Sequence, residues 1–317
     1  PKVQKVIFDI LREMLNDQSS NKEALTKVVI DSKSFDAAIR SLFEFKSKSM
    51  AKASLKFLST YLAERKANIQ NIFKNKLIQT GYALDLFELF KFQLDKSLNR
   101  INKRVGTYAN SLEYLRSSNM KLRVDQQTSI KQDKKHNKLI LLCELFEMAC
   151  DNCFNPFQHF VRVQEFENQS SINLVEVLMN YLIEVVVAFN SRDEEALDMI
   201  KYTFDTLIEF VTGPCQENQD ILMATPKLLE TINNLLEEIQ AMLVMIRGRL
   251  LVDLEVKGIK LYNSLLTFMT TLLEGPMREA NAKVLIEALN LEIIKQQMMF
   301  IYTSFVKGRV KPMQRSC

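Results

Sequence analysis

Residues 209–219 read Glu-Phe-Val-Thr-Gly-Pro-Cys-Gln-Glu-Asn-Gln, and within this stretch one long apolar-periodic segment stops and another begins. Glycine tolerates the left-handed conformation that ends many helices, and proline has its φ angle already set for the first turn of a helix. Gly213-Pro214 therefore predicts a corner between two helices. A related corner, Gly275-Pro276, follows 62 residues later, which suggests a repeated structure.

The composition indicates a mostly helical protein. The 317 residues contain only seven Gly and six Pro, whereas Leu, Ile, Lys, Glu and Phe are abundant, which disfavours the turn-rich chemistry of β-sandwiches. No apolar run approaches the roughly 20 residues that cross a bilayer, so we expect no membrane span in this chain. Five cysteines without framework spacing fit a reducing compartment. The chain has no initiator Met and no signal-peptide pattern, which suggests a piece of a longer protein.

Apolar residues recur with helical spacing along most of the chain. This periodicity predicts helices over residues 2–16, 22–30, 35–46, 50–64, 67–78, 82–104, 138–152, 155–166, 172–190, 193–212, 215–224, 226–247, 249–274 and 277–306. It fades over residues 117–137, where we expect a flexible basic loop. Strand patterns are not sustained anywhere.

Internal similarity favours an all-α fold, an armadillo/HEAT-like helical solenoid. The block 57–62 followed by Asn68-Ile69-Gln70 resembles the block 207–210 followed by Asn218-Gln219. In such arrays each helical unit buries its apolar stripe only against its neighbours. We therefore expect the Leu and Phe stripes to form the core.

Enzyme chemistry finds little support, and we expect no catalytic activity. His136 and His159 are the only histidines, and neither lies in a nucleophile elbow or near a glycine-rich loop. No phosphate-cradling motif is present. Cys150 and Cys153, with Cys143 before and His159 after them, could supply four zinc ligands, but the spacing is irregular, and buried free cysteines are the favoured interpretation.

The basic stretch 91–138 holds twelve Lys or Arg against four Asp or Glu. Such an excess can neutralise the phosphates of nucleic acids or acidic lipids, and a lipid-binding role predicts salt-sensitive binding to anionic vesicles. Aromatic residues for base stacking are sparse, with only Tyr108 and Tyr114 between residues 104 and 138. A solvated helix face followed by a polar loop is therefore the favoured interpretation.

Several blocks, in order, resemble inositol trisphosphate and ryanodine receptors. Residues 208–219 are similar to that family's Thr-Glu-Tyr, Gly-Pro-Cys and Asn-Gln signature. Residues 148–160 resemble its Cys-Glu-Asn motif and the aromatic-rich helix after it, and 170–175 and 272–275 resemble later helices. The matching blocks cover about residues 140–306, the receptor-homology-associated domain. Residues 67–73 resemble the preceding solenoid more weakly.

The resemblance implies a cytosolic regulatory segment of a large tetrameric calcium-release channel, at the cytosolic face of an intracellular store such as the endoplasmic reticulum. Its partners would be other domains of the same channel and neighbouring subunits of a homotetramer, without nucleic acid, and with membrane contact only through the rest of the channel. The expected divisions are an N-terminal helical repeat segment at 1–116, the loop at 117–137 and the receptor-homology-associated domain at 138–317.

The resemblance also implies a regulatory Ca²⁺ site. In the family, one Glu from each of two motifs binds an activating Ca²⁺, and a carbonyl near the channel's C-terminus completes the site. These positions are Asp151 and Glu209 here, while Glu274 matches a carboxylate that supports the region by hydrogen bonding and charge without direct ligation. Asp151 shortens the family's Glu by about 1.5 Å. Cys153 and Thr212 replace a His and a Gln beside the site, which alters its support.

Two less specific interpretations remain beside this one. Glu209 could be a solvated residue on a helix face, and Asp151 with Asn152 could simply end a helix. For the whole chain, the alternative is a helical-repeat scaffold that binds protein partners without sensing calcium.

Overall fold

The computed structural model describes residues 2–16, 33–44, 47–63, 66–117, 138–165, 170–189, 193–246, 252–275 and 279–306. These ranges contain fourteen α-helices and no strand, which confirms the all-α prediction. The helices are α1 (Lys2–Asn16), α3 (Ser34–Glu44), α4 (Lys48–Leu62), α5 (Ala67–Thr80), α6 (Ala83–Ser117), α7 (Lys138–Cys150), α8 (Asn155–Arg162), α9 (Leu174–Val187), α10 (Glu194–Val211), α11 (Gln216–Met223), α12 (Pro226–Ile246), α13 (Val252–Thr271), α14 (Glu279–Ala288) and α15 (Leu291–Val306).

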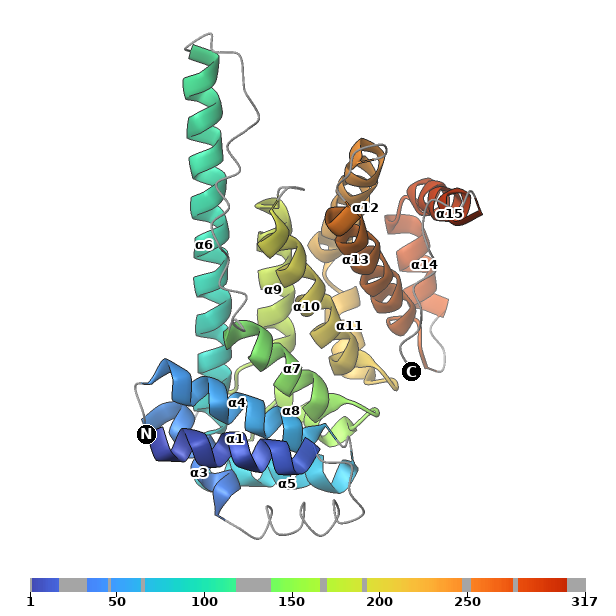
Figure 1. Cartoon of the computed structure of the whole chain (residues 1–317). Helices are drawn as coiled ribbons and strands as arrows, with labels where there is room; N and C mark the ends of the chain where they lie inside the picture. The colour runs from blue at the N-terminus through green and yellow to red at the C-terminus, as the bar shows by residue number, and fades with distance from the viewer. Residues whose placement is uncertain are drawn as a thin grey trace.

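From α4 onward the helices follow one another in groups of three, which we call repeats: α4–α6, α7–α9, α10–α12 and α13–α15. The first helices pack in series, α4 on α7, α7 on α10 and α10 on α13, and the third helices α6, α9, α12 and α15 do the same. Figure 1 shows the repeats advancing from the N-terminal helices at the lower left to α14 and α15 at the right. This arrangement is the predicted armadillo/HEAT-like solenoid.

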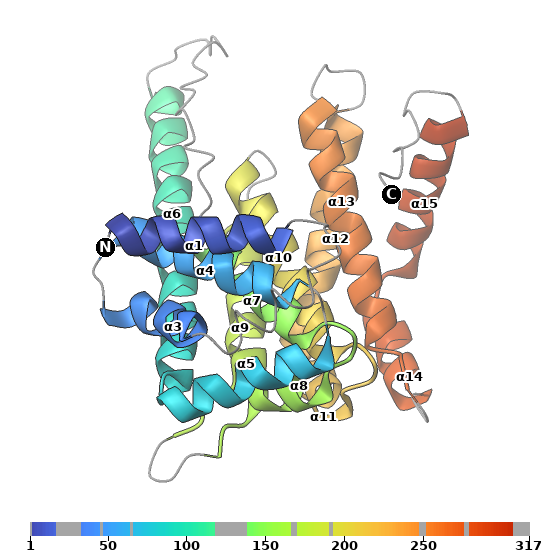
Figure 2. The same ribbon diagram turned by 60° about the horizontal axis from the view of Figure 1, so that its bottom comes forward.

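The second helices of the repeats lie along one edge of the molecule. Helix α5 contacts α8, and α8 contacts α11; all three lie in the lower part of Figure 2. Each is joined to the first helix of its repeat by a short corner, so the corners of successive repeats meet along this edge. The predicted Gly213-Pro214 corner is one of them, because α10 ends at Val211 and α11 begins at Gln216.

Aromatic side chains tie the repeats together in the core. The ring of Phe73 stacks on that of Phe157 with centroids 5.6 Å apart, and Phe146 lies 4.9 Å from Phe90 and 6.4 Å from Phe210. All five are completely buried. Aromatic pairs of this kind contribute about 0.5–1.5 kcal/mol each beyond their area burial. The predicted Phe stripe therefore forms core contacts across three repeats.

Two predicted helix boundaries were wrong. Helix α6 continues to Ser117 instead of ending near residue 104, because the good helix formers in its last two turns outweigh the roughly 1 kcal/mol cost of Gly106. The segment 277–306 forms two helices, since the Asn233 side chain of α12 receives a hydrogen bond from the backbone N–H of Asn290 at 2.9 Å and donates to the oxygen of Ala288. A partner so far away in the sequence leaves no local signal.

The predicted helix at 22–30 and all of the predicted loop after Ser117 lie outside the described residues. So does Pro276 of the second predicted corner, although Gly275 has the expected left-handed backbone, with φ of 106°.

Candidate functional site

The corner between α7 and α8 is a tight turn made of Asp151, Asn152 and Cys153. Asn152 and Cys153 both have left-handed backbone angles, with φ of 57° and 59°. The Oδ1 atom of Asp151 accepts a 2.6 Å hydrogen bond from the backbone N–H of Asn152, which stabilises the turn. Non-glycine residues in this conformation cost about 1–3 kcal/mol each, so the packing around the turn must hold it in place.

The corner between α10 and α11 carries Glu209 in the last turn of α10. The helix ends where the N–H of Thr212 donates to the oxygen of Ile208 at 2.9 Å and the next residue, Gly213, turns left-handed with φ of 89°. Glu209 is half-buried here. Gly213 thus has the left-handed conformation that the sequence predicts for it.

These two corners are in direct contact. A Cβ atom placed on Gly213 would lie 2.1 Å from the Sγ atom and 2.2 Å from the Cβ atom of Cys153. No side chain fits in that space, so Gly213 is required both for its backbone angle and for the close approach of α7 to α10.

Glu274, just beyond the end of α13, joins the same corners. Its Oε2 atom accepts a 3.2 Å hydrogen bond from the backbone N–H of Gly213. The ends of three first helices, α7, α10 and α13, therefore meet at one place on the edge of the solenoid.

The carboxylates of Asp151, Glu209 and Glu274, which we call the corner carboxylates, all lie near enough to the Cys153 thiol to influence its ionisation. Partial desolvation raises the pKa of Cys153, and the charges of Glu274, Glu209 and Asp151 raise it further. Each carboxylate also lies at the C-terminal end of a helix, where the helix dipole is negative and favours a cation. The structure thus brings together all three residues predicted from the resemblance, though their roles toward calcium stay a prediction.

The corner carboxylates match Ca²⁺ in the kind of ligand but not in number. Ca²⁺ takes six to eight oxygen ligands, mainly from carboxylates and carbonyls. Within the described ranges, no group of three or more His, Cys, Asp or Glu is placed to hold a metal ion by itself. Ligands from another segment or from water would have to complete a site here, as the resemblance implies.

The zinc interpretation gains no support from the described residues. Cys143 and Cys150 are buried, whereas Cys153 is exposed. Burial raises the pKa of both buried thiols, so they stay neutral near pH 7. These two cysteines pack in the core of α7 like apolar side chains.

Sequence reasoning missed Glu147, a half-buried carboxyl between α7 and α10. Burial raises its pKa to about 7; Asp205 and Glu144 add to the shift, and Lys201 and a hydrogen bond from Thr206 oppose it. The Thr206 Oγ1 atom donates to Glu147 Oε1 at 2.9 Å. The sequence did carry one signal for a half-buried carboxyl here, because Glu147 stands among the apolar residues of a core helix.

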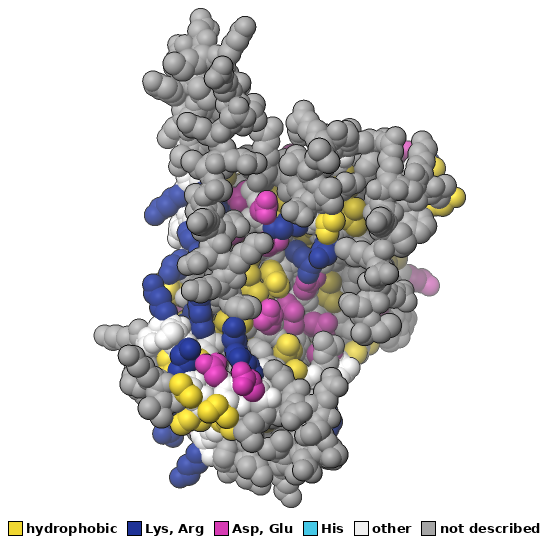
Figure 3. Space-filling model, in the orientation of Figure 1, with side chains coloured by type: hydrophobic (Ala, Val, Ile, Leu, Met, Phe, Trp, Pro, Cys, Tyr) yellow, Lys and Arg dark blue, Asp and Glu magenta, His cyan; other side chains and the backbone are white. Residues whose placement is uncertain are grey.

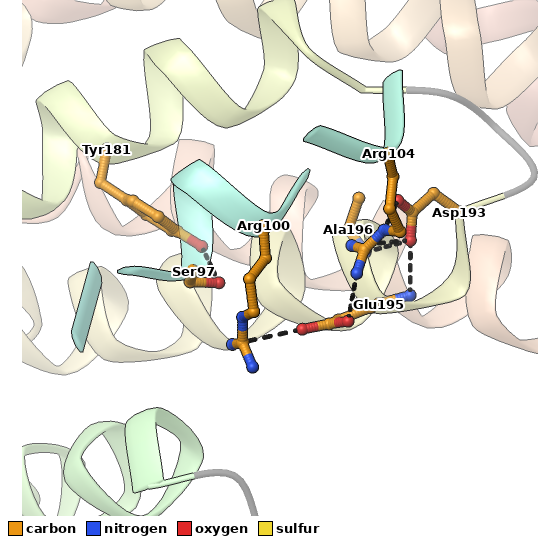
Figure 4. A network of polar contacts seen from close by, with 7 residues as sticks. All are labelled: Ser97, Arg100, Arg104, Tyr181, Asp193, Glu195 and Ala196. Carbon is orange, nitrogen blue, oxygen red and sulfur yellow. Dashed lines mark hydrogen bonds and ion pairs between the residues drawn. The ribbon is translucent and has the colours of Figure 1, made fainter. Parts of the chain in front are cut away.

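Part of the basic stretch is used inside the protein, as Figure 4 shows. Arg104 of α6 binds Asp193 with its Nε atom at 2.9 Å and Glu195 with its Nη1 atom at 2.6 Å, and Arg100 lies 3.3 Å from Glu195. Asp193 also caps α10, accepting from the N–H groups of Glu195 and Ala196 at 3.1 Å. Burial lowers the pKa of Arg104, but the two carboxylates outweigh burial and raise it.

Other Lys and Arg side chains line one edge of the face in Figure 3, over α6. Lys91 and Lys96 are exposed there. The predicted solvated basic face therefore exists over this helix.

None of the described helices combines the length and apolarity that a membrane span requires. Residues 132–236 match the family model described as RyR and IP3R Homology associated, which is 105 of the 317 residues and includes both Asp151 and Glu209. The search of curated proteins found no match. The resemblance to ryanodine and inositol trisphosphate receptors is thus confirmed over residues 132–236.

Proposed function

We propose that this chain is a cytosolic regulatory segment of an intracellular calcium-release channel resembling the inositol trisphosphate receptor, and that it senses Ca²⁺ through Asp151 and Glu209. The observation that carries the proposal is the contact between the ends of three successive first helices, which brings the corner carboxylates to one edge of the solenoid. The matched domain supports it, because it contains two of the three.

Each corner residue has a distinct task in this proposal. Asp151 and Glu209 offer carboxylate oxygens from neighbouring repeats, and Glu274 steadies the corner by accepting the N–H of Gly213. A bound Ca²⁺ supplies positive charge that offsets the mutual repulsion of the carboxylates and the negative helix ends.

The packing of the first helices suggests how Ca²⁺ binding at the corner would change the arrangement of the repeats. Because α7 and α10 pack against each other and belong to successive repeats, drawing Asp151 toward Glu209 changes the angle between repeats. The channel responds only if the two arrangements of the solenoid differ in affinity for the ion. The tetramer, the endoplasmic reticulum and the remaining ligands belong to the same proposal.

The proposal is tested by Glu209→Gln in the full-length channel. Removing one ligand charge should raise the Ca²⁺ concentration for half-activation by about tenfold, since ligand charge sets Ca²⁺ affinity. Glu217→Gln removes an exposed charge from the following helix, α11, and should leave the response in place. An unchanged response of Glu209→Gln would remove Glu209 from the site and favour a scaffold without calcium sensing.

A gain-of-function variant sharpens the same test. Asp151→Glu restores the family's side chain and adds about 1.5 Å of reach. We expect the half-activating Ca²⁺ concentration to fall in this variant. A rise, or no change, would count against direct ligation by residue 151.

A further inference from the structure

The second helices of the first three repeats each carry one fully buried glutamine. These are Gln70 in α5, Gln158 in α8 and Gln219 in α11, with exposed fractions of 0, 1 and 0%. Burying an amide costs free energy unless its polar atoms find partners. The hydrogen bonds that these amides make therefore indicate their role in the structure.

Gln70 contacts the end of the first helix of the next repeat. Its Nε2 atom donates to the backbone oxygens of Met148 at 3.0 Å and Asp151 at 2.8 Å. Both oxygens belong to the last turn of α7 and the residue after it, where no intrahelical N–H is available. The side chain thus ties the end of α7 to α5.

Gln158 and Gln219 repeat this contact in the next two repeats. The Nε2 atom of Gln158 donates to the backbone oxygens of Glu209 at 2.7 Å and Thr212 at 2.8 Å. The Nε2 atom of Gln219 donates to the backbone oxygens of Thr271 at 2.7 Å and Glu274 at 3.4 Å, and it also lies 3.4 Å from the oxygen of Val211. In all three cases two of the acceptors are three residues apart, and one of these two is the backbone oxygen of a residue that carries a corner carboxylate.

The amides act as donors only. The Oε1 atoms of Gln70, Gln158 and Gln219 are buried and have no hydrogen-bond partner among the described residues. A flipped amide would bring Oε1 against two carbonyl oxygens, so the orientation is fixed by the helix ends. Leaving a buried acceptor unsatisfied is costly, yet the same arrangement recurs at all three corners.

We propose that these three glutamines are positioning residues for the corner carboxylates. Each holds the backbone of Asp151, Glu209 or Glu274 to the second helix of the preceding repeat. The spacing of the carboxylates then follows the angle between repeats, and cation binding at the corner is coupled to bending of the solenoid. This inference rests on the proposed calcium site.

Gln158→Met in the full-length protein is the central test, because methionine keeps the shape of the side chain and removes both donors. We expect half-saturation by Ca²⁺ to need about tenfold more ion, the size expected when a partner that orients a metal ligand is lost. Without Ca²⁺, amide hydrogen exchange in the peptide spanning residues 207–215 should become faster. Gln158→Asn, which keeps a shorter amide, should fall between.

Asn233→Leu is the matched control. Asn233 of α12 holds the end of α14 in a similar way, because its side-chain amide donates to the backbone oxygen of Ala288. None of the corner carboxylates lies on either of these helices. The control variant should lower thermal stability to a similar degree while leaving Ca²⁺ affinity unchanged.

The outcomes separate this inference from the function on which it rests. If Glu209→Gln leaves Ca²⁺ binding unchanged, the calcium site itself is wrong. If Glu209→Gln weakens binding but Gln158→Met behaves like Asn233→Leu, the positioning role alone is wrong. Should Gln158→Met fail to fold, Gln158→Asn with exchange and Ca²⁺ titration decides between the same two results.

Discussion

Two groups of carboxylates lie at opposite ends of α10, and they differ in what surrounds them. At the N-terminal end, Asp193 and Glu195 face Arg100 and Arg104, and the positive end of the helix dipole favours their charge. At the C-terminal end, Glu209 joins two further carboxylates at the negative ends of three helices.

The difference teaches what each group contributes. The N-terminal carboxylates stabilise the fold. Asp193 caps α10 and Glu195 lies in its first turn, where the helix dipole favours a negative charge, and each of them also pairs with an arginine. The corner carboxylates lie at or just beyond helix C-termini, where the helix dipole disfavours a negative charge. A cation that bridges neighbouring repeats would remove that penalty, which is why we assign function to the corner and structure to the arginine network.

The largest effect should come from closing the space between the two corners. Gly213→Ala introduces about 1–2 kcal/mol of left-handed strain and a further 1–3 kcal/mol or so of overpacking against Cys153. Unfolding by urea should show a loss of about 2–5 kcal/mol. Gly81→Ala is the control, because Gly81 is also left-handed but has nothing within 4 Å of the added Cβ. Equal losses in the two variants would mean that the corners do not touch.

Glu147 sharpens the comparison, because it is a half-buried carboxyl near the charges of Asp205 and Glu144. Its folded-state pKa of about 7 lies above the ordinary 4.5, so the folded state binds the proton more tightly than the unfolded state. This difference in proton affinity contributes about 3 kcal/mol to the free energy of unfolding. The contribution is complete below pH 4.5 and is lost as the pH rises through 7.

Glu147→Gln should therefore remove this pH dependence. Gln stays neutral and can still accept from Thr206, so the variant should be more stable than the parent above pH 7 and similar to it near pH 5. Urea unfolding at both pH values measures the difference. A variant that follows the parent's pH profile would contradict the raised pKa.

The smallest of these stability effects concerns the arginine network. Asp193→Ala removes the cap of α10 and the partner of Arg104, and should cost about 2 kcal/mol. Asp193→Asn keeps a capping oxygen and should cost about half as much. Raising the salt concentration should narrow the gap between the parent and Asp193→Asn, because screening weakens the ion pair. Identical losses for Ala and Asn would show that the arginine contact, not the cap, dominates.

Much of the architecture could be predicted from local signals. Gly213 marked a corner because its left-handed angle is a local requirement, and the apolar period predicted the stacked helices. The break before Asn290 could not be predicted, because it depends on Asn233, which lies 57 residues earlier. For Glu147 the apolar neighbours in its helix hinted at burial, but its partner Thr206 lies 59 residues away and leaves no local signal.

In the candidate site, too, some residues could be predicted from the sequence and others only from the structure. Asp151, Glu209 and Glu274 were selected by resemblance, and the structure shows why they meet: they end three first helices that pack in series. Gln70 was visible only as part of a repeated block, since nothing local indicates that its amide reaches an oxygen 81 residues later at Asp151.

The most direct measurement is a double-mutant cycle on Ca²⁺ activation of the full-length channel with Asp151→Asn, Glu209→Gln and both together. If the two carboxylates hold one ion, each single variant should weaken the response by about tenfold, and the double variant should be little worse than either, because the site is already lost. Independent, additive effects, or a response that none of the variants moves, would contradict a shared calcium site at this corner.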